Sequence, residues 1–456
     1  MNFVSIETIK YGLSYCLTMP ELKKELSFLQ IVFYGVGIIL GAGIYVLIGE
    51  AAGIAGNAVW ISFGFAALIA AFTGLSYAEL SSMYSKDAAE YVYAQNAFKK
   101  PWLSFGIEWI MIFTGIVSAA TVALGFGRYF NFLFGSDIII TAALLIIILS
   151  FLNYRGIKES ANFNLISTII EMGGLLIIIF IGFLFFGNFK QQDFFFSPTG
   201  WNGILTATSL IFFAYIGFEE MVQVSEETKN SEKIMPKALL VALAISTILY
   251  MLVSISAIGV LGWEKLSSSN APLAEVAGLA IPHASILMAF IALFATANTV
   301  LFSLVVVSRM LYGLSCNNAI PGICSRIGRF GTPFVPVFLV MFLAIGFVLL
   351  GNIKLIASIT DVGIFVVYIF VNASLIFLRF SQPTLQRPFK SPLNIGKFPV
   401  LALLGLLSAG FMLFLFEPIL LLYEVVLVII GIVLFKLYSN KIIQSISAKK
   451  TGKFGN

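Results

Sequence analysis

Apolar stretches long enough to cross a lipid bilayer recur through almost the whole chain, and they restrict its fold more than any other feature. About 20 residues of α-helix cross a hydrocarbon core of roughly 30 Å. We identify twelve such stretches, at 29–55, 57–83, 103–131, 136–154, 161–187, 203–228, 236–262, 283–315, 334–351, 355–379, 398–416 and 419–438. Since 59% of the residues are apolar and only 11% are charged, a water-soluble fold is excluded. The sequence therefore predicts an all-α polytopic membrane protein with twelve transmembrane helices.

The distribution of Lys and Arg predicts the orientation of these helices. If the N-terminus is cytoplasmic, only Arg128, Lys190, Lys265 and Lys354 of the 27 basic residues fall outside, which leaves 23 on the cytoplasmic side. Basic residues are enriched in the short cytoplasmic loops of membrane proteins. We therefore expect a multi-pass protein of the cell membrane with cytoplasmic N- and C-termini. The net charge of +5 then indicates contact with an anionic lipid leaflet and no nucleic-acid partner.

The first apolar stretch contains glycines at its midpoint. Gly41 and Gly43 leave the backbone free to depart from helical geometry. Inside hydrocarbon, each unpaired amide or carbonyl group costs several kcal/mol, so a non-helical segment persists only where protein, ions or a ligand satisfy these groups. Helix packing is the alternative explanation, because Gly37 and Gly41 have the spacing that lets two helices approach closely. We favour an interrupted helix with a binding site.

The sixth apolar stretch shows the same kind of interruption. Gly217 follows Phe213, Ala214 and Tyr215, and two carboxylates come directly after it. Interruptions in the first and the sixth transmembrane helix indicate two units of five helices each. Because five is an odd number, the second unit enters the membrane from the opposite side and is inverted relative to the first. The sequence thus predicts a 5+5 inverted repeat over 29–195 and 196–380. The remaining segments are a cytoplasmic N-terminal segment, 1–28, two peripheral helices in 381–440 and a cytoplasmic tail, 441–456.

The two interruptions together can bind a zwitterion. Backbone amides freed at Gly41, Ala42 and Gly43 can bind a carboxylate beside a positive helix N-terminus. Carbonyl groups freed near Phe213, Ala214 and Tyr215 can accept hydrogen bonds from an ammonium group. Because an α-amino acid carries both groups, the sequence predicts an amino acid site between the two interruptions.

Four motifs resemble the amino acid-polyamine-organocation (APC) superfamily of permeases. They are GAGIYV at 41–46, AAEYVYAQNAF at 88–98, FFAYIGFEE at 212–220 and NTVLFSLVVVSRMLYGL at 298–314. The resemblance implies a leucine-transporter-like fold, in which ten helices form two inverted repeats with discontinuous helices 1 and 6, and two further helices are peripheral. It also implies secondary active transport of an amino acid or an amine by alternating access.

The resemblance implies a role for individual residues as well. Gly41, Ala42 and Gly43 would bind the substrate carboxylate with Ile44 beside them, and Ala214, Tyr215 and Ile216 would offer carbonyl groups to its ammonium group. Phe213 falls where members of the superfamily have an aromatic gate, and Glu219 matches a family carboxylate. The apolar side chains of Ile44, Phe213 and Tyr215 suit a neutral amino acid, whereas Glu219 and Glu220 leave a cationic amino acid or a polyamine as the alternative.

Glu171 is the main candidate for coupling transport to an ion. It lies in the middle of the fifth stretch without a neighbouring cation in sequence, and an ionised carboxylate there costs roughly 2.5 kcal/mol or more. It must therefore carry a proton, bind a cation or pair with another helix. In similar permeases this position can hold a Lys that replaces a sodium ion. We expect proton coupling; a sodium ion held with Thr299 and Ser303, which share a helix face, is one alternative, and a structural pair is the other.

Other polar residues have less specific expectations. Glu219 is a second coupling candidate, Glu108 and Asp361 are further ones, and Glu79 is expected to reach interfacial water near the cytoplasmic end of its helix. His283 is expected to be solvated at the start of a helix, after a short helix within 270–280.

Motifs of other function classes are absent from the sequence. The chain contains no HExxH, GxSxG or P-loop motif, and its three Cys lack metal-ligand spacing. We therefore expect no enzymatic activity, no cofactor and no metal site, and we consider a channel a remote alternative. The expected partners are an amino acid substrate, a coupling proton or sodium ion and the lipid bilayer, and the sequence does not define an oligomeric state.

Overall fold

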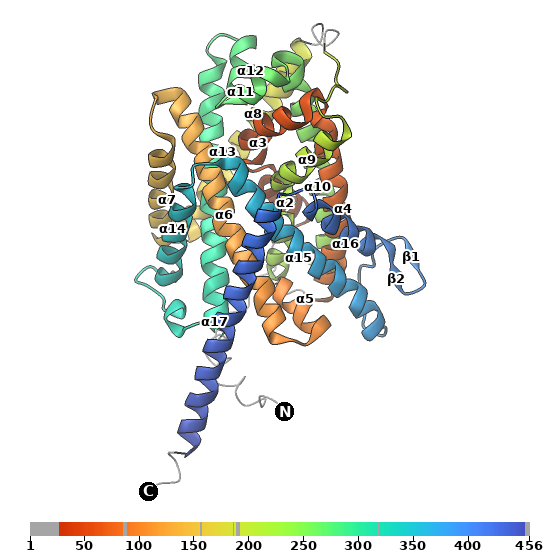
Figure 1. The fold of residues 1–456 in the computed structure, drawn as a ribbon, viewed down its shortest axis with the longest axis vertical. Helices are drawn as coiled ribbons and strands as arrows, with labels where there is room; N and C mark the ends of the chain where they lie inside the picture. Colours follow the sequence, from red (N-terminus) through yellow and green to blue (C-terminus); the bar gives the residue numbers. More distant parts are fainter. Residues whose placement is uncertain are drawn as a thin grey trace.

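The computed structural model describes residues 27–84, 89–155, 157–185, 187, 192–316 and 319–451, without the side chains of 89, 157–165, 223–227 and 437–451. This part of the chain forms long α-helices packed side by side, and several of them run along the long axis of the molecule (Figure 1). The helices of the first half are α2 (Phe28–Leu40), α3 (Gly43–Ala55), η1 (Gly56–Ala58), α4 (Val59–Met83), α5 (Ala89–Phe98), α6 (Pro101–Phe134), α7 (Ile138–Arg155) and α8 (Ile157–Leu184).

The second half begins with a helix that is also interrupted. Its elements are α9 (Trp201–Ile211), η3 (Phe212–Tyr215), η4 (Phe218–Glu227), α10 (Ser231–Leu261), α11 (Trp263–Ser268), α12 (Pro272–Ala280), α13 (Ala284–Cys316), η5 (Gly322–Ser325), α14 (Phe334–Val348), α15 (Ile353–Ser381), β1 (Asn394–Ile395), β2 (Phe398–Pro399), α16 (Val400–Leu413) and α17 (Pro418–Thr451). The two short strands pair in antiparallel register, with Asn394 opposite Pro399 and Ile395 opposite Phe398.

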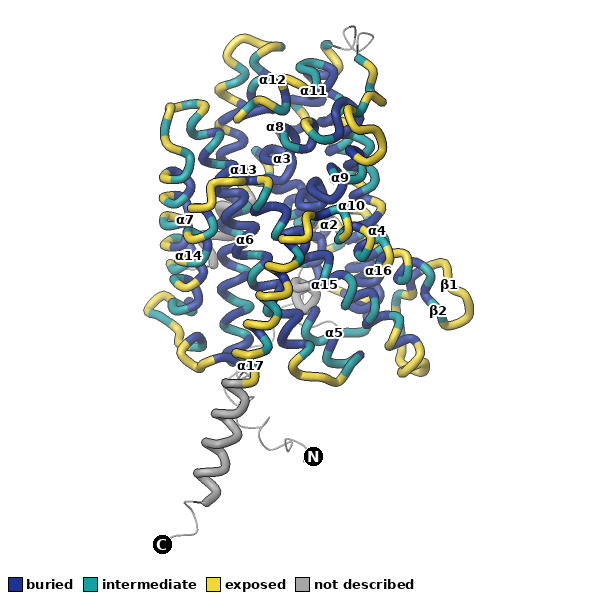
Figure 2. The backbone as a smooth tube through the Cα atoms, viewed as in Figure 1, coloured by how far each residue is buried: buried dark blue, intermediate teal, exposed yellow. Residues whose placement is uncertain are grey.

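The outer surface of the helical body is apolar. In the described residues, nine helical segments are long and apolar enough to cross a membrane, and three shorter apolar helices, α2, α14 and α16, accompany them. Large apolar side chains on the outer helices face outward, such as Ile148 on α7 and Phe180 on α8. Buried residues fill the centre of the molecule (Figure 2). Since lipid is the solvent that an apolar surface of this kind requires, the chain is an all-α, multi-pass membrane protein.

Each of the twelve predicted stretches contains helix, and most ends differ by a few residues; the end predicted at 438 is wrong, because α17 continues to Thr451. The first stretch contains α2 and α3, and the sixth contains α9, η3 and η4, so both predicted interruptions are present. The symmetry between 29–195 and 196–380 stays a prediction, as does the count of twelve spans. The predicted cytoplasmic segment 1–28 falls almost entirely outside the described residues.

The loops between the spans contain short helices. The predicted helix within 270–280 is α12, which has Pro272 in its first turn. His283 is exposed, has a positive φ of 64° and directly precedes α13, as expected for a residue at a helix start. Sequence reasoning did not identify α5 and α11 as helices, because both are too short and too polar to give an apolar period.

Long helices from both halves build the core. α13 packs against α6, α10 against α4, and α15 against both α6 and α16. The broken elements lie among these helices, because α2 packs against α10, and η3 packs against α4. The interruptions therefore lie among long continuous helices that can hold them in position.

Candidate functional site

The two interrupted helices touch each other at their breaks. A Cβ atom at Gly43 would lie 2.5 Å from the Cα atom of Ala214, so only glycine allows this approach. A Cβ atom at Gly217 would likewise lie 2.6 Å from Cγ2 of Ile38, and Gly217 has a φ of 117°, which side chains rarely adopt. Two close contacts thus join the first break to the second.

Hydrogen bonds around Gly217 and Glu219 explain where helix η3 ends. The amide of Ile216 donates to the carbonyl oxygen of Phe213 at 3.3 Å, and Ile216 itself is extended, with φ −60° and ψ 136°. The amide of Gly217 then donates to Oε2 of Glu219 at 3.0 Å, and the hydroxyl of Tyr368 on α15 donates to the same oxygen at 2.9 Å. The Glu219 carboxylate therefore holds the turn that restarts the helix.

A small cavity lies at the breaks. Its volume is about 60 Å³. Nine of the predicted site residues line it: Gly41, Ala42, Gly43, Phe213, Ala214, Ile216, Glu219, Thr299 and Ser303. Residues separated by more than 250 positions in the chain, such as Ala42 and Thr299, thus line one cavity.

Three predicted site residues lie elsewhere. Ile44 is fully buried in the apolar core, and Tyr215 is buried with its hydroxyl donating to the carbonyl oxygen of Phe63 at 3.0 Å. Glu171 on α8 is also outside the lining of the cavity. The structure therefore brings the two breaks and the α13 hydroxyls together, and it separates them from Glu171.

Sequence reasoning missed the contribution of α6 to this cavity. Met111, Thr114 and Ser118 line it, together with Glu220, Ile364 on α15 and the apolar α13 residues Phe302, Val306 and Met310. Thr114 and Ser118 have the same i,i+4 spacing as Thr299 and Ser303, so a search for paired hydroxyls in apolar helices could have found them.

Protein groups already occupy part of the predicted backbone binding surface. The amide of Ala42 donates to Oγ1 of Thr299 at 3.0 Å, and that hydroxyl can donate to the carbonyl oxygen of Ala295 at 3.1 Å. Thr299 therefore fixes the first break to α13. A ligand carboxylate would have to compete with Thr299 for the Ala42 amide or bind the neighbouring amides.

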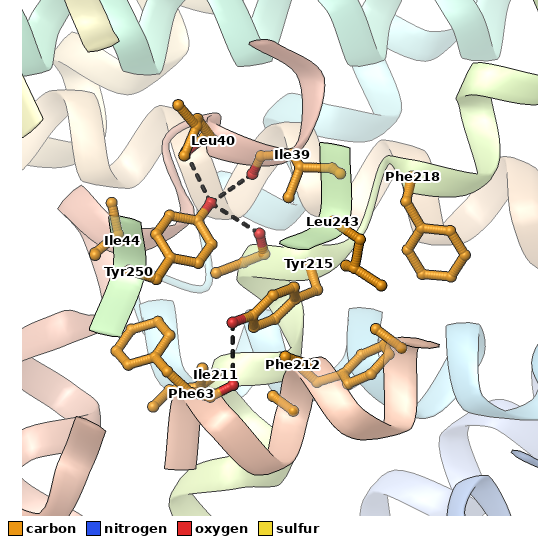
Figure 3. Close-up of a cluster of buried hydrophobic side chains, with 14 of the residues drawn as sticks. Ile39, Leu40, Ile44, Phe63, Ile211, Phe212, Tyr215, Phe218, Leu243 and Tyr250 are labelled. Carbon is orange, nitrogen blue, oxygen red and sulfur yellow. Dashed lines mark hydrogen bonds between the residues drawn. The ribbon is translucent and has the colours of Figure 1, made fainter. Parts of the chain in front are cut away.

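Tyr250 on α10 reaches both breaks from the side of the core (Figure 3). Its hydroxyl lies within hydrogen-bond distance of three carbonyl oxygens: those of Ile39 and Leu40, at the end of α2, and that of Ala214, in η3. Helix ends leave carbonyl groups without intrahelical partners, and the Tyr250 hydroxyl can donate a hydrogen bond to such carbonyl groups at both breaks.

Glu171 lies buried between helices. In the part of the chain that the structure describes, neither of its carboxyl oxygens has a hydrogen-bond partner, whereas its backbone carbonyl accepts from the hydroxyl of Tyr45 at 3.0 Å. One turn earlier on α8, Thr168 packs against α2, because a Cβ atom at Gly37 would lie 2.6 Å from its Cγ2. Glu171 thus belongs to the wall that supports the first break.

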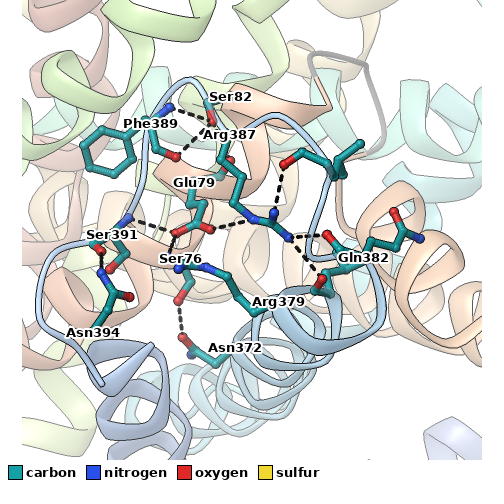
Figure 4. A network of polar contacts seen from close by, with 12 residues as sticks. Ser76, Glu79, Ser82, Asn372, Arg379, Gln382, Arg387, Phe389, Ser391 and Asn394 are labelled. Atoms are coloured by element: carbon teal, nitrogen blue, oxygen red, sulfur yellow. Dashed lines mark hydrogen bonds and ion pairs between the residues drawn. The ribbon is translucent and has the colours of Figure 1, made fainter. Parts of the chain in front are cut away.

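The expectation that Glu79 reaches interfacial water is wrong. Its side chain is fully buried and forms ion pairs with Arg379 at the end of α15 and with Arg387 in the following loop (Figure 4). The backbone amide of Ser391 also donates to Oε2 of Glu79, at 2.8 Å. Interfacial water does not solvate this carboxylate, because the loop after α15 folds back over the end of α4 and covers it. Burial lowers the pKa of Arg387, and the Glu79 carboxylate opposes that decrease.

The other buried carboxylates have few partners. Glu108 and Asp361 are both buried, and neither carboxyl oxygen of Asp361 has a hydrogen-bond partner among the described residues. Glu90 on α5 accepts from the hydroxyl of Tyr77 at 2.9 Å. Burial raises the pKa of Glu90, and the hydrogen bond from Tyr77 opposes part of the increase.

Comparison with known proteins identifies the family. A family model for amino acid permeases matches residues 26–439. The chain belongs to the amino acid permease family. The APC resemblance inferred from the motifs is thereby confirmed, and family membership assigns amino acid transport to this chain.

The permease is similar to transporters with different named substrates. It is 30% identical to the branched-chain amino acid permease BcaP of Bacillus subtilis (strain 168), with 92% of this chain and 94% of the relative covered. It is 26% identical to a methylthioribose transporter of the same organism, with 92% and 94% covered. It is 28% identical to the vacuolar cationic amino acid transporter 4 of Arabidopsis thaliana, with 80% of this chain and 64% of the relative covered.

Proposed function

We propose that this permease is a secondary active transporter that carries a neutral amino acid through the cell membrane by alternating access around the two breaks. The contact between Gly43 and Ala214 carries the proposal, because it joins two unwound segments beside one cavity. Unwound segments of this kind near the bilayer midplane are where secondary transporters bind their substrates. In this proposal, repeats 29–195 and 196–380 move relative to each other, and both termini are cytoplasmic.

The roles of the lining residues follow from their chemistry. The amides at Gly41 and Gly43, and that of Ala42 once the ligand displaces Thr299, bind the substrate carboxylate at the N-terminal end of α3, where the helix dipole favours a negative charge. Carbonyl groups of the second break bind the ammonium group, and Phe213 covers the site as its gate. Ile44 and Tyr215 act from behind the breaks by holding their shape, since neither lines the cavity.

Most of the remaining lining suits an apolar side chain. Met111, Phe302, Val306, Met310 and Ile364 are apolar, and a branched-chain amino acid permease is among the relatives. A cationic amino acid is the second candidate, because the carboxylates of Glu219 and Glu220 also line the cavity and cationic amino acid transporters are among the relatives. A polyamine would need a similar negative environment.

The coupling ion of the proposed cycle is a proton carried by Glu171. A buried carboxyl group without a hydrogen-bond partner favours its neutral form, so it can gain and lose a proton as its exposure changes between the two facing states. Sodium coupling is the alternative, with Thr299 and Ser303 as ligands. Glu219 is the second coupling residue of the proposed cycle. Its carboxyl group lines the cavity and also accepts from the Gly217 amide, so a change in its protonation alters the turn at the second break.

Uptake into proteoliposomes tests the proposal. Purified permease is given labelled L-leucine, L-lysine, spermidine and methylthioribose, each with a pH gradient, with a sodium gradient or with neither. We expect saturable leucine uptake that a pH gradient drives above equilibrium and that unlabelled leucine exchanges from the other side. Preference for lysine would select the second candidate, whereas uptake that does not saturate would indicate a channel and contradict the proposal.

The variant Glu171→Gln distinguishes proton coupling from substrate exchange. We expect this variant to keep leucine exchange but to lose accumulation driven by a pH gradient, because Gln cannot carry the proton. Thr299→Ala and Ser303→Ala provide the comparison: under the proton hypothesis they keep the response to pH, and under the sodium alternative they abolish a response to sodium. Full pH-driven accumulation by Glu171→Gln would remove Glu171 from the mechanism.

A further inference from the structure

Tyr250 connects the two breaks through a single hydroxyl group. Its oxygen lies 2.9 Å from the carbonyl oxygen of Leu40 and 3.0 Å from that of Ala214, and it also contacts the carbonyl oxygen of Ile39. Leu40 is the last residue of α2, and Ala214 lies in η3. A group on α10 thus contacts the backbone on both sides of the interface between the unwound segments.

The hydroxyl cannot satisfy all three carbonyl groups at once. A tyrosine hydroxyl has one proton to donate, whereas each carbonyl oxygen can accept two hydrogen bonds. Three carbonyl oxygens therefore share one proton in a fully buried place, and their acceptor capacity is left partly unused. A buried acceptor without a donor is unfavourable, so a cationic donor nearby is stabilised.

Two of these carbonyl groups belong to residues that line the cavity. Ile39 and Ala214 are lining residues, whereas Tyr250 itself is not. The hydroxyl thus approaches these residues from outside the cavity, and an ammonium group inside it can use the acceptor capacity that remains. Their second lone pairs make this double use possible.

The ring of Tyr250 is held independently of its hydroxyl. Its centroid lies 5.5 Å from that of Phe63 on α4 and 5.4 Å from that of Tyr215, to which it is nearly perpendicular. The Tyr215 hydroxyl in turn donates to the carbonyl oxygen of Phe63, so the three rings form one packed unit. A phenylalanine at position 250 would keep these ring contacts.

We propose that Tyr250 is a positioning residue of the transport cycle, whose hydroxyl sets the spacing between the end of α2 and η3 so that their carbonyl groups bind the substrate ammonium. The inference rests on the proposed function, because it assumes an amino acid in the cavity. Tyr250 acts through the backbone of the two breaks and does not touch the substrate.

Tyr250→Phe is the test, with Tyr129→Phe as the matched control. Tyr129 is also a fully buried tyrosine, but its hydroxyl donates, at 3.1 Å, to the carbonyl oxygen of Tyr45, which lies inside α3 two residues after the first break, and it contacts no carbonyl group of the second break. The two variants and the wild type are reconstituted, and initial rates of labelled L-leucine uptake are measured against concentration, or of L-lysine if the wild type prefers it. Hydrogen exchange of peptides covering 39–43 and 212–217 is measured in parallel on the detergent-solubilised proteins.

Tyr250→Phe is expected to raise KM about tenfold while it changes the maximal rate less than twofold, and to speed hydrogen exchange at both breaks together. Tyr129→Phe is expected to keep KM within twofold and leave exchange at the breaks unchanged. An unchanged KM for Tyr250→Phe would overturn the proposal, and so would faster exchange at only one break. If Tyr250→Phe alone failed to fold, the hydroxyl would be a folding determinant and the proposal would also fail, whereas absent uptake by the wild type would contradict the proposed function instead.

Discussion

Gly43 shows how one residue type decides the geometry of the site. Its backbone lies so close to Ala214 that no side chain fits between them, and this contact brings two breaks from distant parts of the chain together. The sequence allowed two explanations for such glycines, helix packing and an unwound segment. In the structure both apply to Gly43: it lies where the first break ends and α3 begins, and it packs closely against Ala214 in η3.

Gly43→Ala is expected to reduce amino acid uptake at least tenfold. The new Cβ would lie 2.5 Å from the Ala214 Cα, which belongs to the backbone and cannot move aside cheaply, and overpacking of this kind costs roughly 1–3 kcal/mol. Gly106→Ala on α6 is the control, since its Cβ would meet nothing within 4 Å. The measurement is initial uptake by both variants, normalised to the protein in the liposomes, and equal rates would contradict the close packing.

Glu90 gives a prediction about the pH dependence of stability. Because burial raises its pKa in the folded state, the protonated form stabilises the fold at low pH, and this contribution is lost as the pH rises from the ordinary value of about 4.3 through the raised one. Glu90→Gln cannot ionise but can still accept from Tyr77. We expect it to match the wild type near pH 4 and to melt at a higher temperature near pH 8.

Thermal unfolding in detergent between pH 4 and pH 8 checks this expectation for Glu90. The electrostatic neighbours of Glu90 include the carboxyl groups of Glu108, Glu219 and Glu220, all of which stay in the variant. The relevant result is therefore the difference between the two melting curves. Parallel curves over the whole pH range would show that Glu90 does not titrate in the folded protein.

At the scale of elements, the loop after α15 is attached to the end of α4. Glu79 is the centre of this attachment, with Arg379 and Arg387 on one side and the Ser391 amide on the other. The sequence placed Glu79 near a helix end, but it did not reveal that a loop more than 300 residues later covers it. A local pattern cannot predict such a contact, because only the packing of α15 against α4 produces it.

Glu79→Gln is expected to destabilise the fold by about 3–5 kcal/mol, because it leaves two buried guanidinium groups without a counter-charge. Arg128→Gln is the comparison: its ion pair with Glu50, at 3.0 Å, is about a quarter exposed, and such a pair contributes roughly 0–1 kcal/mol. Melting temperatures of both variants in the same detergent give the answer. A larger loss for Arg128→Gln than for Glu79→Gln would contradict this ranking.

At the scale of the whole molecule, apolar helices pack around two broken ones, and their outer faces require lipid. The proposed orientation follows from the basic residues alone, and it places the loop at α11 outside and the loop at η5 inside. The broken helices and the cavity lie inside this body, where long continuous helices such as α6 and α13 contribute residues to the cavity lining.

Cysteine labelling of whole cells tests this orientation. A membrane-impermeant maleimide is expected to label Ser268→Cys, which is exposed at the end of α11, and not to label Arg329→Cys until the cells are opened. The native Cys16, Cys316 and Cys324 are all predicted on the cytoplasmic side, so the wild type is expected to stay unlabelled in intact cells. Labelling of Arg329→Cys alone in intact cells would invert the assignment.

The sequence by itself determined the membrane fold, the approximate helix ranges and the positions of both breaks, because hydropathy and glycine placement are properties of short segments. Tertiary structure decided which residues meet: it brought Thr299 to the Ala42 amide and Tyr250 to both breaks, and it kept Glu171 out of the cavity lining. It also buried Glu79 beneath a distant loop. Contacts of this kind depend on how whole helices pack, and no local pattern in the chain encodes the angle and depth at which one helix meets another.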